Sequence, residues 1–156
     1  MKVLIAYGSK YGCTEKAALK LKGMIKNSTT VNLSKGEKTN VSDYDCVLLG
    51  GSIYMGKLQK QVVDFANGNI DILLTKKMGL FLCCGSKDQS EQQLKTSFPE
   101  KLVQKAKTLG YFGYIYDFNK MNFLFKMMVK KIENINESKD CLDIKAIEAF
   151  ANEFTK

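Results

Sequence analysis

The chain has 156 residues, of which 45% are hydrophobic and 26% are charged, an ordinary composition for one globular domain. It contains no His, and all 24 basic residues are Lys because Arg is absent, which excludes imidazole catalysis and guanidinium clamps on a ligand. No apolar run approaches the roughly 20 residues of a membrane-spanning helix, and the first residues lack the pattern of a secretion signal. We therefore expect a cytoplasmic protein.

The net charge of +8 predicts an anionic partner, which can be nucleic acid, a membrane surface or an acidic ligand. A Lys-rich composition without functional meaning is the alternative. Nucleic acid is disfavoured because the chain has neither Arg nor a known nucleic-acid-binding motif. The five Cys include no CxxC pair, so we expect free thiols and no metal site. Demanding chemistry is then expected to come from a cofactor.

The first predicted strand covers residues 2–7, a nearly continuous apolar run of the kind that is buried on both faces of a sheet. A short loop with Gly and Ser follows, and residues 14–26 have the period of an amphipathic helix. Residues 30–33 predict a weak second strand, and residues 44–49 predict the third.

A second Gly-containing loop covers residues 50–56, and residues 78–84 predict the clearest buried strand of the chain. We expect Ser90 to cap the next helix and this helix to end near Gly110. Residues 111–116 then predict a fifth strand.

The last third of the chain contains two predicted helices. Residues 119–132 give a basic amphipathic helix with aromatic and Met side chains on its apolar face. Asp143 is predicted to cap the last helix, 144–154. Strands that alternate with helices predict a parallel sheet with helices on both faces. We expect one α/β domain over residues 1–156, a three-layer sandwich with five parallel strands in the order 2-1-3-4-5.

The loop after the first strand gives the best functional signal. The amides at a helix N-terminus favour an anion, the hydroxyls of Ser9 and Thr14 can donate to a phosphate, and Gly12 lets the backbone curl around it. Lys10 is expected to add a formal charge there. An ordinary strand-to-helix turn is the alternative. The spacing fits neither a P-loop nor the GxGxxG fingerprint.

Ligands of such a sheet bind at the carboxyl ends of its first and third strands, where both Gly-containing loops lie. Tyr54 and Met55 are expected to contact a flat ring, and folding of these two side chains onto the core is the alternative. A third loop, 85–88, closes the same edge of the sheet. Glycines of the second loop are expected to let the backbone approach the ligand closely: Gly50, Gly51 and Gly56.

The sequence Gly8-Ser9-Lys10-Tyr11-Gly12-Cys13-Thr14 resembles the phosphate loop of flavodoxins, and the similarity extends over almost the whole chain. The resemblance implies a flavodoxin-like fold with FMN as cofactor. It also implies three groups of cofactor-binding residues, at the phosphate, against one ring face and at the pyrimidine end of the ring. These groups are Ser9, Lys10, Tyr11, Gly12, Cys13 and Thr14; Ser52, Ile53, Tyr54, Met55 and Gly56; and Cys84, Gly85, Ser86, Lys87 and Asp88.

The pattern Gly50-x-Ser52-Ile53-x-x-Gly56 and the basic, aromatic segment 116–132 resemble the menaquinone-linked protoporphyrinogen dehydrogenases of the flavodoxin type. This resemblance implies a basic insertion within residues 117–135. It also implies an FMN-dependent oxidoreductase that acts on a flat, anionic substrate and passes electrons to a quinone. The third loop has no aromatic residue to stack on the outer flavin face, which leaves that face open to a substrate.

The alternatives for function and for the basic segment remain open. The protein is an enzyme, an electron carrier that exchanges single electrons with a redox partner protein, or a fold-only interaction domain without flavin. The basic segment lies on a membrane surface at the inner face of the membrane, or it packs on the domain or across a homodimer. No side chain is assigned as a catalytic acid or base, although Tyr54, Lys57 and Lys87 can reach a substrate over the ring.

Overall fold

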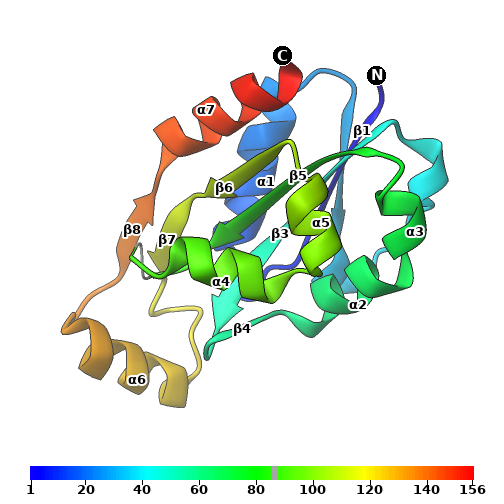
Figure 1. Cartoon of the computed structure of the whole chain (residues 1–156). Helices are drawn as coiled ribbons and strands as arrows, with labels where there is room; N and C mark the ends of the chain where they lie inside the picture. Colours follow the sequence, from blue (N-terminus) through cyan, green and yellow to red (C-terminus); the bar gives the residue numbers. More distant parts are fainter. Residues whose placement is uncertain (86–87) are drawn as a thin grey trace.

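A central sheet organises the chain (Figure 1), and in the described residues five of its strands run parallel. The computed structural model describes residues 1–85 and 88–156. From edge to edge the parallel strands are β2 (Ser28–Asn32), β1 (Val3–Tyr7), β3 (Cys46–Tyr54), β5 (Lys77–Cys83) and β6 (Thr108–Tyr111). A short strand, β4 (Lys57–Leu58), pairs antiparallel with the end of β3. With only the parallel strands counted in chain order, this is the order 2-1-3-4-5, which confirms the predicted fold class.

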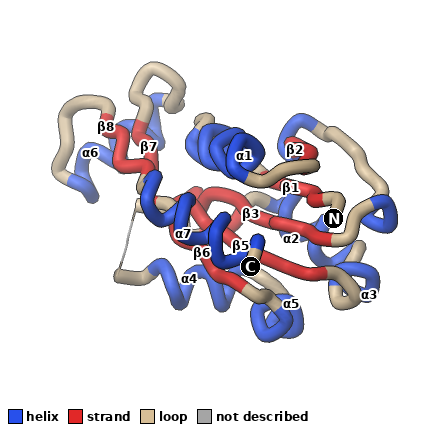
Figure 2. The backbone as a smooth tube through the Cα atoms, turned by 90° about the horizontal axis from the view of Figure 1, so that it is seen from above, coloured by secondary structure: helices blue, strands red, loops and turns tan. Residues whose placement is uncertain are grey.

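Helices cover both faces of the sheet, as Figure 2 shows from above. One face is covered by α1 (Cys13–Met24) and α7 (Ile144–Thr155). The other is covered by α2 (Lys60–Gly68), α3 (Ile70–Leu73), α4 (Ser90–Ser97) and α5 (Glu100–Lys105). Successive side chains of a strand point to opposite faces, so Val3 and Ile5 pack on the first layer, and Leu4 and Ala6 on the second. Burial on both faces explains the continuous apolar run of β1.

The helix expected from Ser90 to near Gly110 is instead two helices. Pro99 has no backbone N–H and disfavours helical geometry at the residue before it, and Phe98 is accordingly extended, with φ −109° and ψ 154°. The helix α4 therefore ends at Ser97, and α5 begins after Pro99. Ser90 is the first helical residue, and Gln89 occupies the capping position predicted for Ser90.

The fifth strand of the sheet, β6, covers Thr108–Tyr111, so only Tyr111 of the strand expected over residues 111–116 belongs to it. Gly113 has a positive φ of 75°, and a β-carbon there would collide with the Cys141 carbonyl oxygen. The chain therefore leaves the main sheet after β6. It continues as β7 (Gly113–Tyr116), which pairs antiparallel with β8 (Lys139–Leu142) in a separate ribbon.

The basic amphipathic helix follows β7 and precedes β8 in the chain. It is α6 (Phe123–Glu133) and sits at one end of the molecule, beside β7 and β8, in both views (Figures 1 and 2).

The cap predicted for the last helix is confirmed, because Asp143 Oδ1 accepts a hydrogen bond from the Ala146 amide at 2.9 Å. None of the helices in the described ranges is long and apolar enough to span a membrane.

Candidate functional site

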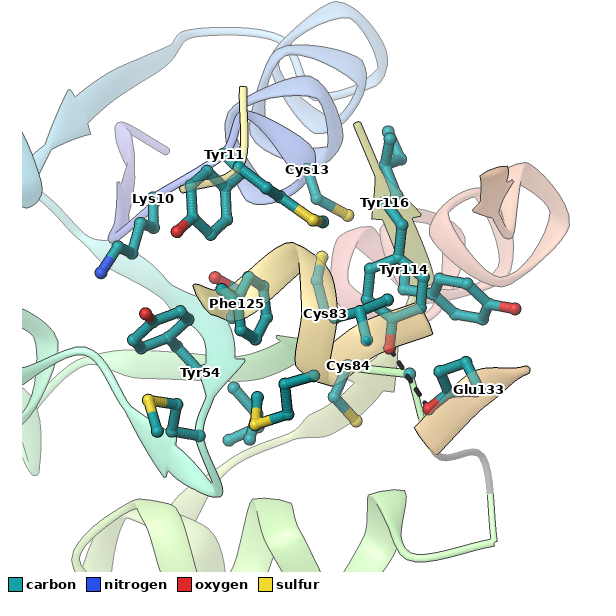
Figure 3. Close-up of a pocket in the computed structure, with 18 of the residues that line it drawn as sticks. Lys10, Tyr11, Cys13, Tyr54, Cys83, Cys84, Tyr114, Tyr116, Phe125 and Glu133 are labelled. Atoms are coloured by element: carbon teal, nitrogen blue, oxygen red, sulfur yellow. Dashed lines mark hydrogen bonds between the residues drawn. The ribbon is translucent and has the colours of Figure 1, made fainter. Parts of the chain in front are cut away.

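A cavity of about 520 Å³ opens where the carboxyl ends of β1, β3 and β5 meet (Figure 3). The strand register brings these ends together, since Tyr7 pairs with Gly50 and Ser52 with Cys83. The volume lies within the range of small-molecule sites in proteins. The residues expected at the cofactor that line it are Lys10, Tyr11, Cys13, Ser52, Ile53, Tyr54, Met55, Gly56, Cys84 and Gly85.

The first loop presents an open helix N-terminus beside this cavity. Gly12 precedes α1 with a φ of 94°, and no side chain in the described part of the protein caps the helix. The first helical hydrogen bond runs from the Lys16 amide to the Gly12 carbonyl at 3.0 Å. The amides of residues 13–15 therefore have no acceptor within the helix, which makes this end favourable for an anion.

The Thr14 hydroxyl adds an unsatisfied group to this loop. Thr14 is fully buried, and its Oγ1 has no hydrogen-bond partner among the described residues. It lies near enough to the Cys83 thiol to affect the pKa of that thiol, but no hydrogen bond of standard geometry joins them. A buried hydroxyl without a partner costs stability, and a bound phosphate oxygen would satisfy it.

The Ser9 side chain shapes the loop from within. Its Oγ accepts a hydrogen bond from the Gly12 amide at 3.1 Å, and the Ser9 amide donates to Ser34 Oγ at 3.1 Å. Ser9 borders a second hollow beside the first, together with Lys57. Ser9 therefore holds the curve of the loop by hydrogen bonds to the chain itself.

Lys10 does not reach over the first loop. Its Nζ lies 3.7 Å from the centroid of the Tyr54 ring and 5.7 Å from that of Tyr11. Cation–π attraction at this distance joins the first loop to the second. The Lys10 charge, which was expected at the phosphate, thus lies at the end of the cavity that the Tyr11 and Tyr54 rings border.

The second loop was expected to begin at Gly50, but β3 continues to Tyr54. Gly50 and Gly51 belong to β3, and the missing β-carbon of Gly50 leaves room for the Phe81 ring of the core. The absence of a β-carbon at Gly50 thus serves core packing, and a close approach of a ligand to these two glycines stays a prediction. The turn itself is made by Met55 and Gly56, which have φ values of 50° and 76°, and both line the cavity.

An aromatic side chain from α6 completes the ring end of the site. Phe125 stacks on Tyr11 with centroids 5.4 Å apart and planes 11° apart, and lies 4.6 Å from the Tyr54 ring. Figure 3 shows the three rings gathered on one side of the cavity. The insertion thus covers the cavity in part from the side of the first and second loops. The sequence period placed Phe125 on the apolar face of its helix but could not show what that face meets.

The tyrosines of the site have shifted acidities. The Asn122 amide and the Lys10 ammonium hold the pKa of the Tyr54 phenol below its ordinary value. Burial and the neighbouring Tyr54 raise the pKa of Tyr11. At the opposite end of the cavity, burial and the Glu133 carboxylate raise the pKa of Tyr116, whose hydroxyl lies 3.5 Å from Glu133 Oε1. Tyr116 therefore stays a neutral hydrogen-bond donor at neutral pH.

The floor of the cavity carries three thiols, those of Cys13, Cys83 and Cys84. The hydrogen bond with Cys13 and complete burial raise the pKa of Cys83 well above its ordinary value. Cys83 is therefore a protonated, weakly nucleophilic group. Of the third loop, Cys84 and Gly85 line the cavity and Asp88 does not. Ser86 and Lys87, also expected at the cofactor, lie outside the described residues.

A family model described as a flavodoxin domain matches residues 4–143. This chain belongs to the flavodoxin-domain family. No curated protein sequence matches it. Among solved structures, flavodoxin 1 from Bacillus cereus is 18% identical, with a TM-score of 0.62 and coverage of 99% of this chain and 97% of its own.

Two further structures share the fold of this flavodoxin domain. The flavodoxin of Streptococcus pneumonia TIGR4 is 19% identical, with a TM-score of 0.62 and coverage of 99% of this chain and 98% of its own. The Fusobacterium nucleatum flavodoxin, solved with flavin mononucleotide bound, is 13% identical, with a TM-score of 0.55 and the same two coverages. At these identities the likeness shows the fold.

FMN is the cofactor of flavodoxins, so membership of the family confirms the cofactor expected from the sequence. The residues present fit it. The open N-terminus of α1 and the orphaned Thr14 hydroxyl suit a phosphate. The apolar cavity beside Tyr54 suits a flat ring. Ser9, Gly12 and Thr14 with the open end of α1 would hold the phosphate end, and Ser52 to Gly56 with Cys84 and Gly85 would hold the ring.

Proposed function

We propose that this flavodoxin domain is an FMN-dependent oxidoreductase that oxidises a flat, anionic substrate of the porphyrinogen class and passes the electrons to a quinone. The observation that carries the proposal is the lysine-rich helix α6, which roofs the cavity. Its inner face contributes Met128, Val129 and Ile132 to the lining. A roof over the cavity creates a binding space beside the ring, which a protein that only exchanges electrons does not need.

The charge of the roof matches an anionic substrate. Lys120, Lys126, Lys130 and Lys131 lie on the insertion, and Glu133 is the acidic residue of α6. A cluster of one sign attracts ligands of the other sign and raises their local concentration. The apolar lining would contact the faces of a flat ring system while the lysines attract its carboxylates.

The chain's own residues would bind and orient the substrate. The FMN supplies a centre that accepts electrons when it is bound. Tyr54 and Lys10 close one side of the cavity. Tyr116 stands at the other side as a neutral phenol whose hydroxyl donates to Glu133. The hydroxyl oxygen of Tyr116 and the Glu133 carboxylate could accept hydrogen bonds from N–H groups of a substrate.

A quinone acceptor dissolved in lipid requires contact with a membrane. We propose that the outward face of α6 makes this contact at an anionic membrane surface. The side chains of Phe123 and Leu124 are 74% and 80% exposed, and Met127 is 53% exposed. Exposed apolar side chains flanked by lysines are typical of helices that lie in the membrane interface. A second copy of this chain is the other surface that could cover this face.

The experiment is an anaerobic assay of the FMN-loaded protein with protoporphyrinogen and a menaquinone analogue. We expect stoichiometric oxidation of the substrate and reduction of the quinone. The double variant Lys130→Gln/Lys131→Gln should raise KM about fivefold through the lost attraction, with kcat unchanged. Lys101→Gln/Lys105→Gln on α5 is the matched control, because it removes the same charge from exposed positions of another element. Stoichiometric FMN without turnover would contradict the proposal.

An electron carrier that exchanges single electrons with a redox partner protein is the second candidate. The turn between β3 and β4 favours it, because Met55 at the cavity mouth is 64% exposed. A partner protein could approach the ring edge there. The number of electrons that the bound flavin takes up in each reduction step distinguishes the two candidates.

A further inference from the structure

The insertion contacts the first loop through a hydrogen bond as well as through the aromatic stacking described above. Asn122 Nδ2 donates a hydrogen bond to the Tyr11 hydroxyl at 3.3 Å, and Phe125 stacks on the same Tyr11 ring. Asn122 also caps α6, since its Oδ1 accepts from the Phe125 amide at 2.9 Å. The start of α6 is therefore tied to the loop that precedes α1, although the two lie more than a hundred residues apart in the chain.

One ammonium group of the insertion lies directly at this loop. Lys120 Nζ is 3.4 Å from the position that a β-carbon on Gly12 would occupy. Asp117 directs the side chain there, because its Oδ2 lies 3.7 Å from Lys120 Nζ. Asp117 also builds the turn, accepting the Asn119 amide on Oδ1 at 3.1 Å and the Lys120 amide on its carbonyl at 3.0 Å. The position of Lys120 thus follows from the fold of the insertion.

We propose that Lys120 is a ligand of the FMN phosphate, supplied by the insertion to a loop that has no positive side chain of its own over the helix end. Lys10, the basic residue within the loop, is held on the Tyr54 ring. The phosphate would lie between the open amides of residues 13–15, the Thr14 hydroxyl and the Lys120 ammonium. This inference rests on FMN binding and is independent of the redox reaction proposed above.

The charges around the helix end agree with this role. A phosphate monoester carries about 1.5 to 2 negative charges at pH 7, and the first turn of α1 contains an acidic residue, Glu15. The Glu15 carboxylate is bound on its far side by Lys35 at 2.9 Å and by the Tyr7 hydroxyl at 3.3 Å. Its charge is thereby compensated away from the loop. The ammonium of Lys120 lies beside Gly12, the residue that precedes α1, and offers a full charge near a helix end that offers a partial one.

The role also gives the insertion a second function in addition to roofing the cavity. Because Lys120 stands just before α6, a phosphate that binds Lys120 draws the start of α6 onto the first loop. A bound phosphate would then add one more contact to those of Asn122 and Phe125 that hold the start of α6 at the first loop.

The test compares FMN with riboflavin, which lacks the phosphate. Lys120→Gln should raise the dissociation constant for FMN about tenfold at low salt and leave that for riboflavin unchanged. Lys120→Arg should keep most of the FMN affinity. The matched control is Lys101→Gln, an exposed lysine of α5 that does not line the cavity. Flavin fluorescence quenching reports both affinities without any turnover.

Salt dependence gives a second readout. The FMN affinity of the unaltered chain should fall as ionic strength rises, and it should fall less in Lys120→Gln because one exposed charge pair is missing. Equal FMN affinities for the unaltered chain and Lys120→Gln would overturn the role of Lys120 and leave the proposed function intact. Equal losses for FMN and riboflavin would also overturn it, because they indicate general damage to the site. Failure of the unaltered chain to bind FMN at all would overturn both proposals.

Discussion

At the scale of single residues, the sequence predicts which side chains gather at the site better than it predicts their contacts. Ser9, Gly12 and Thr14 stand around the open end of α1 as their spacing indicates. Lys10 was expected at the phosphate because it lies within the loop, but the adjacent Tyr54 ring holds it elsewhere. The competing contact comes from a residue more than forty positions away, which no local pattern reveals.

Burial beneath the first loop changes the pKa of Tyr7. Tyr7 is 4% exposed, and its hydroxyl donates to Glu15 Oε1 at 3.3 Å. Burial, with Glu15 next in importance, raises the pKa of Tyr7 from 10.0 to about 12. Since the folded pKa is the higher one, the contribution of Tyr7 to stability is complete below pH 10 and is lost as the pH rises towards about 12.

We therefore predict that Tyr7→Phe weakens the alkaline loss of stability. The free energy of unfolding in urea should fall less steeply with pH above about 10 in the variant than in the unaltered chain, because the variant has no phenol at position 7 to ionise on unfolding. Below that pH the two curves should run parallel. Parallel curves through the whole alkaline range would show that the ionisation of Tyr7 is not linked to folding.

At the scale of elements, the strands and helices of the core follow from local pattern, and the exceptions have local causes. Pro99 divides the helix that was expected to reach Gly110. Gly113 divides the expected fifth strand through its positive φ. Both residue types are visible in the sequence. The partner of the strand after Gly113 is not, because β8 follows α6 and pairs with β7 only through the tertiary fold.

At the scale of elements, we predict that the exposed apolar face of α6 binds anionic membranes. Phe123→Ser/Leu124→Ser should lower the binding of the FMN-loaded protein to vesicles that contain phosphatidylglycerol by at least about tenfold, since each side chain loses apolar burial in the membrane interface. Vesicles of phosphatidylcholine alone should bind the unaltered chain weakly, because they do not attract the lysines. Cosedimentation measures both.

The control for this prediction is Leu19→Ser. Leu19 is a 54% exposed apolar residue of α1, outside the insertion. Its replacement should leave vesicle binding unchanged. An unaltered chain that ignores anionic vesicles and sediments as a dimer, with the double variant monomeric, would assign the outward face of α6 to a second copy of this chain instead.

At the scale of the whole molecule, the alternation of strands and helices predicts a parallel sheet with helices on both faces, and the resemblance to flavodoxins supplied the strand order that the structure confirms. The edge that binds ligand follows from the same order, because the carboxyl ends of β1 and β3 are adjacent. The position of α6 over the cavity could not be predicted from the order of the elements. This position depends on the contacts of Lys120, Asn122 and Phe125 with the first loop, which join distant parts of the chain.

The central claim is that this flavodoxin domain holds FMN beneath α6 and uses it for two-electron oxidation. Visible absorbance followed through an anaerobic reductive titration tests this claim most directly. We predict one FMN per chain and a single reduction step that takes up two electrons. Two separate one-electron steps would contradict the enzymatic role in favour of the electron carrier, and a colourless protein that cannot be reconstituted with FMN would contradict the site itself.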